Sequence, residues 1–186
     1  MKKYILLVFT IFFIACQQKD EKIINSLQVL YYNGIFERVT AVSCDEIAYT
    51  PLKKDALSIK VSEDGSYVPK EAVILDTTLT DRKVLQEIQL ELKKCKIVND
   101  EYDDVRMKCY FFYKNGQKDS LCIGNITNYG IYNNQSIKLT NKFVYLIREN
   151  CGFYKWVGVD NMKYFDELND STFARKKVKS QSGEEY

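Results

Sequence analysis

The segment from Thr80 to Cys95 does most to limit what this 186-residue chain can fold into. Its apolar residues recur at the spacing of one face of an α-helix; they are Val84, Leu85, Ile88, Leu92 and Cys95. The stripe is narrow and the opposite face is charged. A helix of this kind has to bury its apolar side against something larger, and a sheet is the simplest partner.

The ends of this helix also carry signals. At its start, Thr80 alone, or Thr78 together with Asp81, can accept the first unpaired backbone N–H groups. At its end the helix macrodipole favours cations, and three lysines stand there: Lys93, Lys94 and Lys96.

Short strand-like segments separated by turn residues make up most of the remaining chain. The pattern predicts strands near 23–32, 36–43, 57–61, 72–75, 105–113, 120–126 and 153–159. The first segment also fits helical spacing, but alternation up to Tyr31 and the turn signal Asn33-Gly34 favour a strand that continues into a hairpin. Asp64-Gly65 and Asn115-Gly116 mark further turns, and residues 128–135 are rich in turn formers. Aromatic residues on both faces of 105–113 predict that this strand is central in its sheet.

A second, shorter helix is predicted at about 142–150, with Gly152 as its C-terminal stop. Hairpins dominate the order of elements and strand–helix–strand alternation is absent. We therefore predict an α+β fold: an antiparallel sheet of hairpins packed with one main helix (about 80–95) and the second helix. One domain would span residues 23–168, and the polar residues 169–186 are expected to form a disordered tail.

The first 22 residues have the composition of a targeting segment followed by a tether. Lys2 and Lys3 precede an apolar run from Tyr4 to Ile14, which is interrupted only by Thr10. A helix of about 11 residues is about 17 Å long, whereas a bilayer core is roughly 30 Å thick. The run therefore predicts the core of a signal peptide covering residues 1–15, followed by a polar tether at 16–22.

The junction Phe13-Ile14-Ala15-Cys16 resembles the lipobox of bacterial lipoproteins, with Phe13 where that family usually has Leu. The resemblance implies cleavage before Cys16, lipid on its thiol, and attachment to the membrane through that lipid. Gln17 is not the Asp of an inner-membrane retention signal, which favours the outer membrane. Residues 18–21 resemble the export signal of surface lipoproteins in Bacteroidota, and they equally fit a plain polar tether.

Charge and residue usage exclude several classes of function. Without Lys2 and Lys3 the mature chain keeps 25 of its 27 basic residues against 25 acidic ones, so nothing predicts a nucleic-acid partner. The sequence contains no histidine. This excludes Ser-His and Cys-His catalysis and the common histidine-containing metal sites, while carboxylate, Ser-Lys and calcium chemistry remain open. We expect no cofactor and no metal.

Five cysteines remain after Cys16, and the cell envelope permits disulfides. The turn at Asn115-Gly116 leaves two registers open. A two-residue turn places Cys109 directly opposite Cys122, within reach of a disulfide. A three-residue turn, 114–116, places Cys109 against Leu121 and Cys122 against Lys108, on opposite faces. Because the compartment is oxidising, we favour the bridge between Cys109 and Cys122.

Other candidate sites come from clusters of polar and aromatic residues. Aromatic rings flanked by amides can hold a sugar ring or a peptide, which makes candidates of Tyr129, Tyr132, Asn133, Asn134, Tyr154 and Trp156. The acidic run 99–104 lacks calcium-loop spacing and is interpreted as a solvated loop. The basic run 175–179 is interpreted in the same way. Three segments resemble the short O-glycosylation motif of Bacteroidota envelope proteins, starting at Asp76, Asp119 and Asp170, and Ser171 is the most accessible acceptor.

These observations favour an envelope lipoprotein with a small non-catalytic binding domain and a protein or glycan partner. Two alternatives stay open at this point. One is an inhibitor or immunity lipoprotein that blocks a hydrolase, and the other is a histidine-free carboxylate enzyme. A flat aromatic patch would favour binding, and a cleft with two close carboxyl groups would favour the enzyme.

Overall fold

A computed structural model describes residues 22–33, 41–48, 59–61, 67–69, 73–99, 104–180 and 183–186. Within these residues the chain forms an antiparallel sheet of seven strands in the order β4-β1-β6-β7-β8-β9-β5. The strands are β1 (Ile24–Tyr32), β4 (Ile74–Leu79), β5 (Lys96–Ile97), β6 (Val105–Tyr113), β7 (Lys118–Gly124), β8 (Tyr129–Tyr132) and β9 (Gln135–Lys138). A separate hairpin joins β2 (Ile59–Val61) to β3 (Tyr67–Pro69). The predicted α+β class is confirmed.

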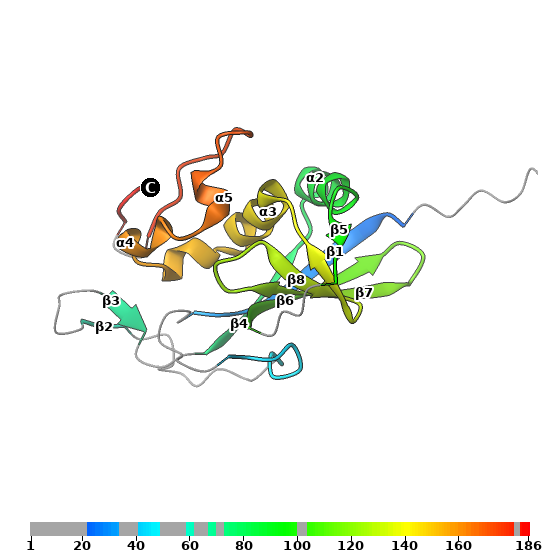
Figure 1. Ribbon diagram of the computed structural model, residues 1–186, viewed down its shortest axis with the longest axis horizontal. Coiled ribbons are helices and arrows are strands. Elements are labelled where there is room, and N and C mark those ends of the chain that lie inside the picture. The colour runs from blue at the N-terminus through cyan, green and yellow to red at the C-terminus, as the bar shows by residue number, and fades with distance from the viewer. Residues whose placement is uncertain are drawn as a thin grey trace, which may run out of the picture.

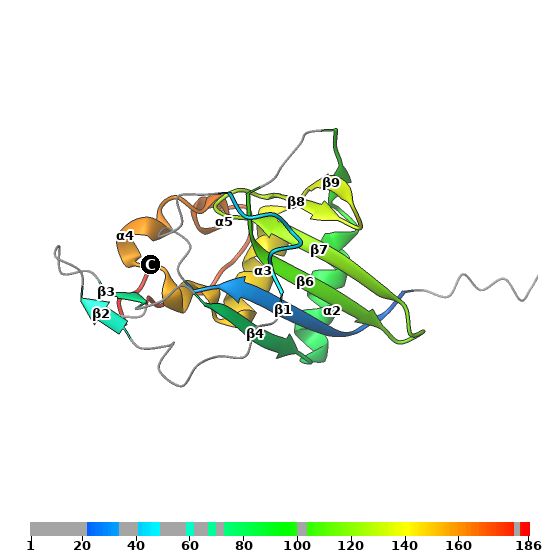
Figure 2. The ribbon, with the colours of Figure 1, turned by 90° about the horizontal axis from the view of Figure 1, so that it is seen from below.

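The main helices, α2 (Arg82–Leu92) and α3 (Asn141–Cys151), lie side by side on one face of the sheet (Figure 1). Three short helical segments follow α3 at one end of the molecule: η1 (Phe153–Trp156), α4 (Val159–Met162) and α5 (Asp166–Asn169). The segment 41–48 lies on the opposite face of the sheet, as the view from below shows (Figure 2). The largest hydrophobic cluster fills the space between sheet and helices, and a smaller one includes Leu30, Tyr32, Val42 and Ile47.

Strand β1 has a neighbour along both edges, because it pairs with β4 through Leu27–Tyr32 and with β6 through most of its length. The predicted hairpin between 23–32 and 36–43 is therefore wrong. Residues 41–43 are not a strand, and 34–40 lie outside the described residues. Asn33 instead ends the strand by a reciprocal contact: its N–H donates to the Val73 carbonyl at 3.1 Å, and its side-chain oxygen accepts from the Val73 N–H at 2.8 Å.

Helix α2 begins at Arg82 and is capped by Asp81 alone. The Asp81 carboxylate accepts from the N–H groups of Lys83 at 2.8 Å and Val84 at 3.1 Å. Neither Thr80 nor a capping pair with Thr78 has this role, since the longer β4 takes in Thr78. Of the predicted stripe, Leu85 and Ile88 are fully buried, and the other members pack partly buried against the core.

The β6–β7 hairpin adopts the three-residue turn. Cys109 pairs with Leu121 and Cys122 pairs with Lys108, so the two cysteines lie on opposite faces of the sheet. The favoured bridge between Cys109 and Cys122 is therefore wrong. Gly116 takes a φ of 81°, which closes this turn. Cys122 is instead bonded to Cys44, with 5.8 Å between their Cα atoms, and this disulfide fixes segment 41–48 to the face opposite the helices.

Residues 128–135, predicted only as a turn-rich stretch, contain most of a further hairpin, β8–β9. Its turn is Asn133-Asn134, both with positive φ, 46° and 67°. Two consecutive left-handed residues are what a tight hairpin turn of this kind requires, and asparagine tolerates that conformation better than most residues.

Helix α3 matches its prediction closely. Thr140 caps it by accepting from the N–H of Phe143 at 3.1 Å, and Gly152 ends it with a φ of 78°. The strand predicted at 153–159 is wrong, because η1 and the start of α4 occupy that segment. Its buried residues, Phe153, Tyr154 and Val157, are spaced for a helical turn and not in strand alternation.

The C-terminal segment, expected to be a disordered tail, has defined contacts with the domain. Val178 is 1% exposed and exchanges backbone hydrogen bonds with Tyr186. The Lys176 N–H donates to the hydroxyl of Tyr145 at 2.9 Å, and Phe173 packs against the core. Polar composition concealed these few apolar anchors, and residues 181–182 lie outside the described residues.

Candidate functional site

Asp119 is a buried charged residue of the sheet at the centre of a cluster of polar side chains. It lies on β7, directly opposite Phe111, on the sheet face that the helices cover. The three-residue turn determines this placement, because a shift of one residue would turn Asp119 to the other face. Asp119 is only 6% exposed.

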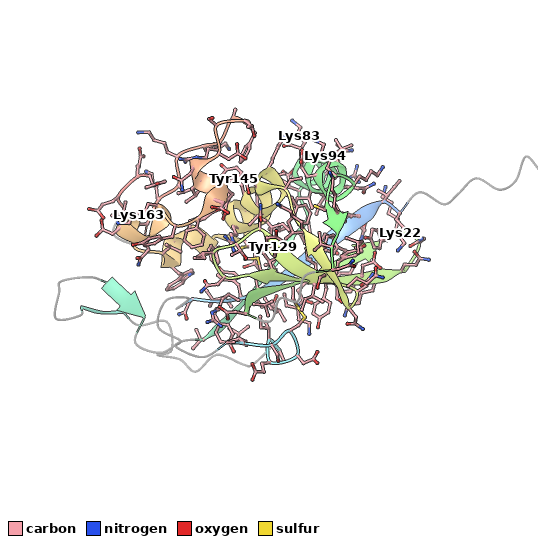
Figure 3. All side chains as sticks on the ribbon, viewed as in Figure 1. Lys22, Lys83, Lys94, Tyr129, Tyr145 and Lys163 are labelled. Carbon is pink, nitrogen blue, oxygen red and sulfur yellow. A yellow bond between two sulfur atoms is a disulfide. The ribbon has the colours of Figure 1, made fainter. Side chains whose placement is uncertain are left out.

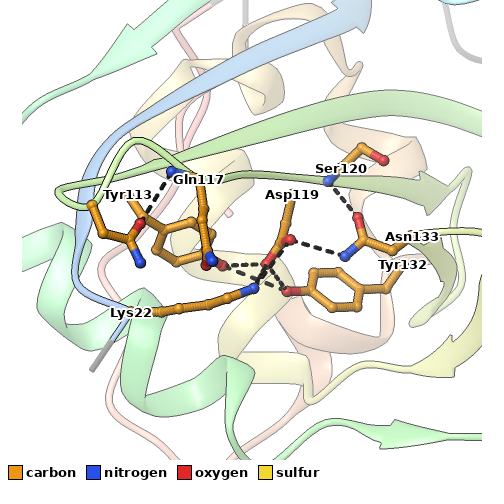
Figure 4. Close-up of polar contacts among 8 residues, drawn as sticks. Lys22, Tyr113, Gln117, Asp119, Ser120, Tyr132 and Asn133 are labelled. Atoms are coloured by element: carbon orange, nitrogen blue, oxygen red, sulfur yellow. Dashed lines mark hydrogen bonds and ion pairs between the residues drawn. The ribbon is translucent and has the colours of Figure 1, made fainter. Parts of the chain in front are cut away.

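Four residues donate to the Asp119 carboxylate (Figure 4). Oδ2 accepts from the hydroxyl groups of Tyr113 at 2.8 Å and Tyr132 at 2.5 Å. Oδ1 accepts from the Asn133 side-chain amide at 3.0 Å. The Lys22 ammonium is 3.3 Å from Oδ1 and 3.1 Å from Oδ2. We call these five residues the Asp119 cluster.

The electrostatics of the cluster keep Asp119 ionised. Burial alone raises the pKa of Asp119, but the hydrogen bonds from Tyr132, Asn133, Tyr113 and Lys22 outweigh it and lower this pKa to about 2. Burial, together with hydrogen bonding to the carboxylate, raises the pKa of Tyr132 to about 12 and that of Tyr113 further. The phenols are therefore donors and the carboxylate is the acceptor.

A carboxylate offers about four lone-pair positions, and five contacts occupy those of Asp119. With its pKa lowered, the group is also a weak base. The arrangement suits a structural connection and not proton transfer. It joins the first described residue of the chain, Lys22, to the β6–β7 and β8–β9 hairpins.

The six residues predicted to bind a ligand do not form one site. Tyr132 and Asn133 belong to the Asp119 cluster, and the exposed Asn134 is in the β8–β9 turn. Tyr129 is three residues before Tyr132 on β8, so the two side chains point to opposite faces of the sheet. The Lys138 ammonium lies 5.5 Å from the ring centre of Tyr129. Tyr154 and Trp156 are on η1 at the opposite end of the molecule.

Tyr154 has a structural role in a buried ionic network that the sequence did not reveal. Its hydroxyl donates to Glu167 Oε1 at 2.9 Å, and the same oxygen pairs with Arg148 Nη1 at 2.5 Å. Arg148 also donates to the carbonyls of Gly124 and Asn125. Its guanidinium carbon lies 4.9 Å from the ring centre of Phe153 and 5.0 Å from that of Phe165. Both charged side chains are fully buried.

A group of aromatic and polar residues that the sequence did not single out lies on the face opposite the helices. Register places Gln28, Tyr110 and Ser120 side by side across three strands, and Ser26, Phe112 and Lys118 in the next row. Tyr110 and Phe112 are half-buried and Lys118 is exposed. The Lys118 ammonium lies 3.7 Å from the ring centre of Tyr110 and 5.3 Å from that of Phe112. We call these six residues the open-face patch.

The aromatic residues of β6 were noticed in the sequence, but only as a sign that the strand is central. That prediction is confirmed, because β6 lies between β1 and β7. Central position does not require both faces to be covered. The pattern Tyr110, Phe112 against Phe111, Tyr113 is therefore the signal from which the patch can be found.

In the described part of the chain three cysteines are free, and all three are poor nucleophiles. Burial raises the pKa of the Cys109 thiol well above its ordinary value, that of Cys151 to about 12, and that of the half-buried Cys95 to a smaller extent. Among the described residues, no three histidine, cysteine, aspartate or glutamate side chains come together as a metal site.

The other sites predicted from the sequence are the O-glycosylation candidate, the two charged runs and the lipidation site. Ser171 is exposed, and the Asp170 carboxylate before it accepts from the Thr172 N–H at 2.7 Å. In the basic run, Lys177 and Lys179 both lie near Glu185. Most of the acidic run, residues 100–103, lies outside the described residues, and so does Cys16 with the whole of residues 1–21.

In the described part of the chain, no helix has both the length and the apolar character needed to cross a membrane. Comparison with protein-family models, with curated proteins and with solved structures finds no match to this chain.

Proposed function

We propose that this chain is an envelope-anchored bacterial lipoprotein whose α+β domain acts by binding a protein or glycan partner, without catalysing a reaction. The anchor is the lipid expected on Cys16, at the junction that resembles a lipobox. The proposed location is the cell envelope, at the outer membrane, with the domain available to partners there.

The open-face patch is the observation that carries the binding proposal. It is an array of two aromatic rings, one lysine and three uncharged polar side chains on neighbouring strands. Aromatic rings provide large contact areas at a low cost in side-chain entropy, and the hydroxyl and amide groups provide hydrogen bonds. Such a surface suits a sugar ring or an extended peptide lying across the strands.

Two buried carboxylates, Asp119 and Glu167, do not suit the carboxylate-enzyme alternative. The Asp119 carboxylate is saturated by donors, and Glu167 is fully buried against Arg148. A general acid–base pair needs carboxyl groups that can reach a substrate and exchange protons with it. Neither of these two residues meets that requirement.

A photocrosslinking experiment in cells tests the patch. A benzoylphenylalanine in place of Phe112 should form a specific crosslink in the envelope. The matched control is the same residue in place of Tyr164, an aromatic side chain that is 51% exposed beside α4. With the identified partner, Phe112→Ala and Lys118→Ala should each weaken binding at least tenfold, and Tyr164→Ala should not. Binding that ignores both patch variants would refute the proposal.

The anchor has its own test. Cys16→Ser should leave an uncleaved, unlipidated precursor, whereas the wild-type N-terminus should carry acyl mass on Cys16 in mass spectrometry. Replacing Lys19, Asp20 and Glu21 by alanine tests surface display. If they form an export signal, protease added to whole cells should cleave the wild type but not this variant; equal cleavage would make the segment a plain tether.

A further inference from the structure

A pocket of about 230 Å³ lies between the end of α3 and the C-terminal segment. Its lining consists of three lysines, one carboxylate, one aromatic residue and one glycine: Lys155, Lys177, Lys179, Glu149, Tyr154 and Gly152. It is distinct from both the Asp119 cluster and the open-face patch. Figure 3 shows Lys22, which belongs to the Asp119 cluster, at the other end of the long axis from Lys163 and the C-terminal segment.

The walls of the pocket are fixed by contacts outside it. Gly152 ends α3 in the left-handed conformation, and the Tyr154 hydroxyl is held by buried Glu167. On the other wall, buried Val178 pairs with Tyr186, which sets its neighbours Lys177 and Lys179 on the outer side of the segment. A shape held in this way is present before any ligand arrives.

The charges in the pocket favour an anionic ligand. Lys177 and Lys179 share a single carboxylate, Glu185, at 3.6 Å and 3.4 Å, and they are 75% and 65% exposed. Each ammonium has three N–H donors, so both keep donors for a ligand. Lys155 has no carboxylate within ion-pair distance among the described residues, and its side chain lies across Gly152.

Glu149 adds a hydrogen-bond acceptor to this cationic site. It is half-buried, and burial raises the pKa of its carboxyl group, against the opposing effect of Lys176 and Lys155. A carboxyl group beside three ammonium groups can accept from a hydroxyl group adjoining the anion. The pocket is smaller than the roughly 300–1,000 Å³ of sites for drug-sized molecules, which limits the ligand to about one sugar ring.

We propose that this pocket binds a small soluble ligand that carries one phosphate or carboxylate group next to hydroxyl groups, as an acidic or phosphorylated monosaccharide does. The choice of a soluble ligand over an anionic lipid headgroup rests on the proposed anchor. Lipid at Cys16 would hold the Lys22 end near the membrane, and the pocket lies at the other end of the molecule.

Calorimetric titration of the full-length chain in nonionic detergent tests the proposal, with glucose 6-phosphate and glucuronate as probes. Trp156, the only tryptophan in the sequence, directly follows Lys155 and provides a second readout by fluorescence. Both probes should bind saturably at millimolar concentration or below, while glucose and sodium chloride at equal ionic strength should not. The double variant Lys177→Ala/Lys179→Ala should weaken binding at least tenfold. Lys163→Ala, which removes a lysine outside the pocket, should leave it unchanged.

Two results would overturn the proposal. One is the absence of saturable binding for both probes, or binding that the double variant retains in full. The other is co-sedimentation with phosphatidylglycerol vesicles that the double variant loses, without binding of either soluble probe; this would assign the pocket to a lipid headgroup. A failure of lipid attachment at Cys16 would leave the titrations unaffected, so the two proposals fail separately.

Discussion

Among single residues, Asp119 has the greatest consequence for how the domain is held together. Its charge is shielded from water, yet it is stabilised by two phenols, an amide and an ammonium. Hydrogen bonds to a charged group contribute more than those between neutral groups. The cluster connects residues 97 positions apart in the chain, Lys22 and Asp119, so its loss would loosen the N-terminal edge of the domain as well as the hairpins.

Asp119→Asn should lower the free energy of unfolding by about 2–3 kcal/mol, because an amide presents donors to a site built from donors. Asp76→Asn is the matched control. Asp76 is exposed on β4 and accepts one hydrogen bond, from Gln28 at 2.9 Å, so its replacement should change stability by less than about 0.5 kcal/mol. Urea unfolding followed by circular dichroism measures both, and equal effects would contradict a special role for Asp119.

Asp119 should also affect how the free energy of unfolding depends on pH. The folded-state pKa of Asp119, about 2, lies below its ordinary value of 3.8. Its contribution is therefore present above about pH 4 and is lost as the pH falls through the folded-state pKa. The difference in unfolding free energy between wild type and Asp119→Asn should shrink between about pH 4 and pH 2. A constant difference would show that Asp119 has the same pKa in both states.

The sequence revealed the cluster only in part. Tyr132 and Asn133 were selected, but as ligand-binding residues, because nothing local shows that a carboxylate will face them. Asp119 stood out only as the first residue of a glycosylation-like motif. Its partners become visible when register is known, and the dipeptide Asn115-Gly116 fits either of two turns. The missing information is the register in which distant strands pair, and residue types alone do not determine that register.

At the scale of elements, the pairing of strands decides which cysteines can meet. The elements predicted most accurately were β6 and α3, and for α3 the sequence marked the C-terminal end at Gly152. β8–β9 was missed because its short strands are rich in polar residues and tyrosine. The Cys44–Cys122 bond depends on a segment 78 positions away, which no spacing rule predicts.

Alkylation of the native oxidised protein should label Cys95 first, since it is half-buried, while Cys109 and Cys151 should react only after unfolding. Peptide mapping should recover Cys44 linked to Cys122. Replacing both with alanine should destabilise the fold by about 2–4 kcal/mol, because the bond closes a long loop. Cys95→Ala is the control and should have little effect. A peptide linking Cys109 to Cys122 would refute this register.

Gly130 tests the pairing of β7 with β8. A Cβ at this position would collide with the backbone carbonyl of Cys122, which has no room to move within the sheet. Gly130→Ala should therefore lower the unfolding free energy by about 1–3 kcal/mol. At Gly158 the nearest atom to a new Cβ is 3.7 Å away, so Gly158→Ala should be close to neutral. Similar unfolding midpoints for the two variants would count against the described contact.

At the scale of the whole molecule, the Arg148–Glu167 pair connects three elements that are not adjacent in the sequence. They are α3, α5 and the loop after β7. Removing one partner of a buried pair leaves an uncompensated charge, which typically costs about 3–5 kcal/mol. Sequence patterns did not reveal this pair, because arginine on a helix with polar neighbours usually faces solvent. Its burial follows from the short helices that cover the end of α3.

Glu167→Gln should destabilise the domain by several kcal/mol, about 3 or more. Glu185→Gln is the matched control, because it breaks only exposed pairs and should cost less than about 1 kcal/mol. The double variant Arg148→Met/Glu167→Leu should lose less unfolding free energy than the sum of the losses in the single variants Arg148→Met and Glu167→Leu. Additive effects in thermal unfolding would show that the two residues act independently.

The position of β1 between two strands affects how the domain would resist a pulling force from the proposed anchor. The chain enters the domain through β1, which is hydrogen-bonded along both sides to β4 and β6. A lipid at Cys16 and a partner bound to the open-face patch, which spans β1, β6 and β7, would load this strand along its axis. The bonds on both sides would then be loaded in shear and would share the force, instead of opening one after another as in a zipper. A domain connected in this way should resist unfolding under tension better than one held through an edge strand.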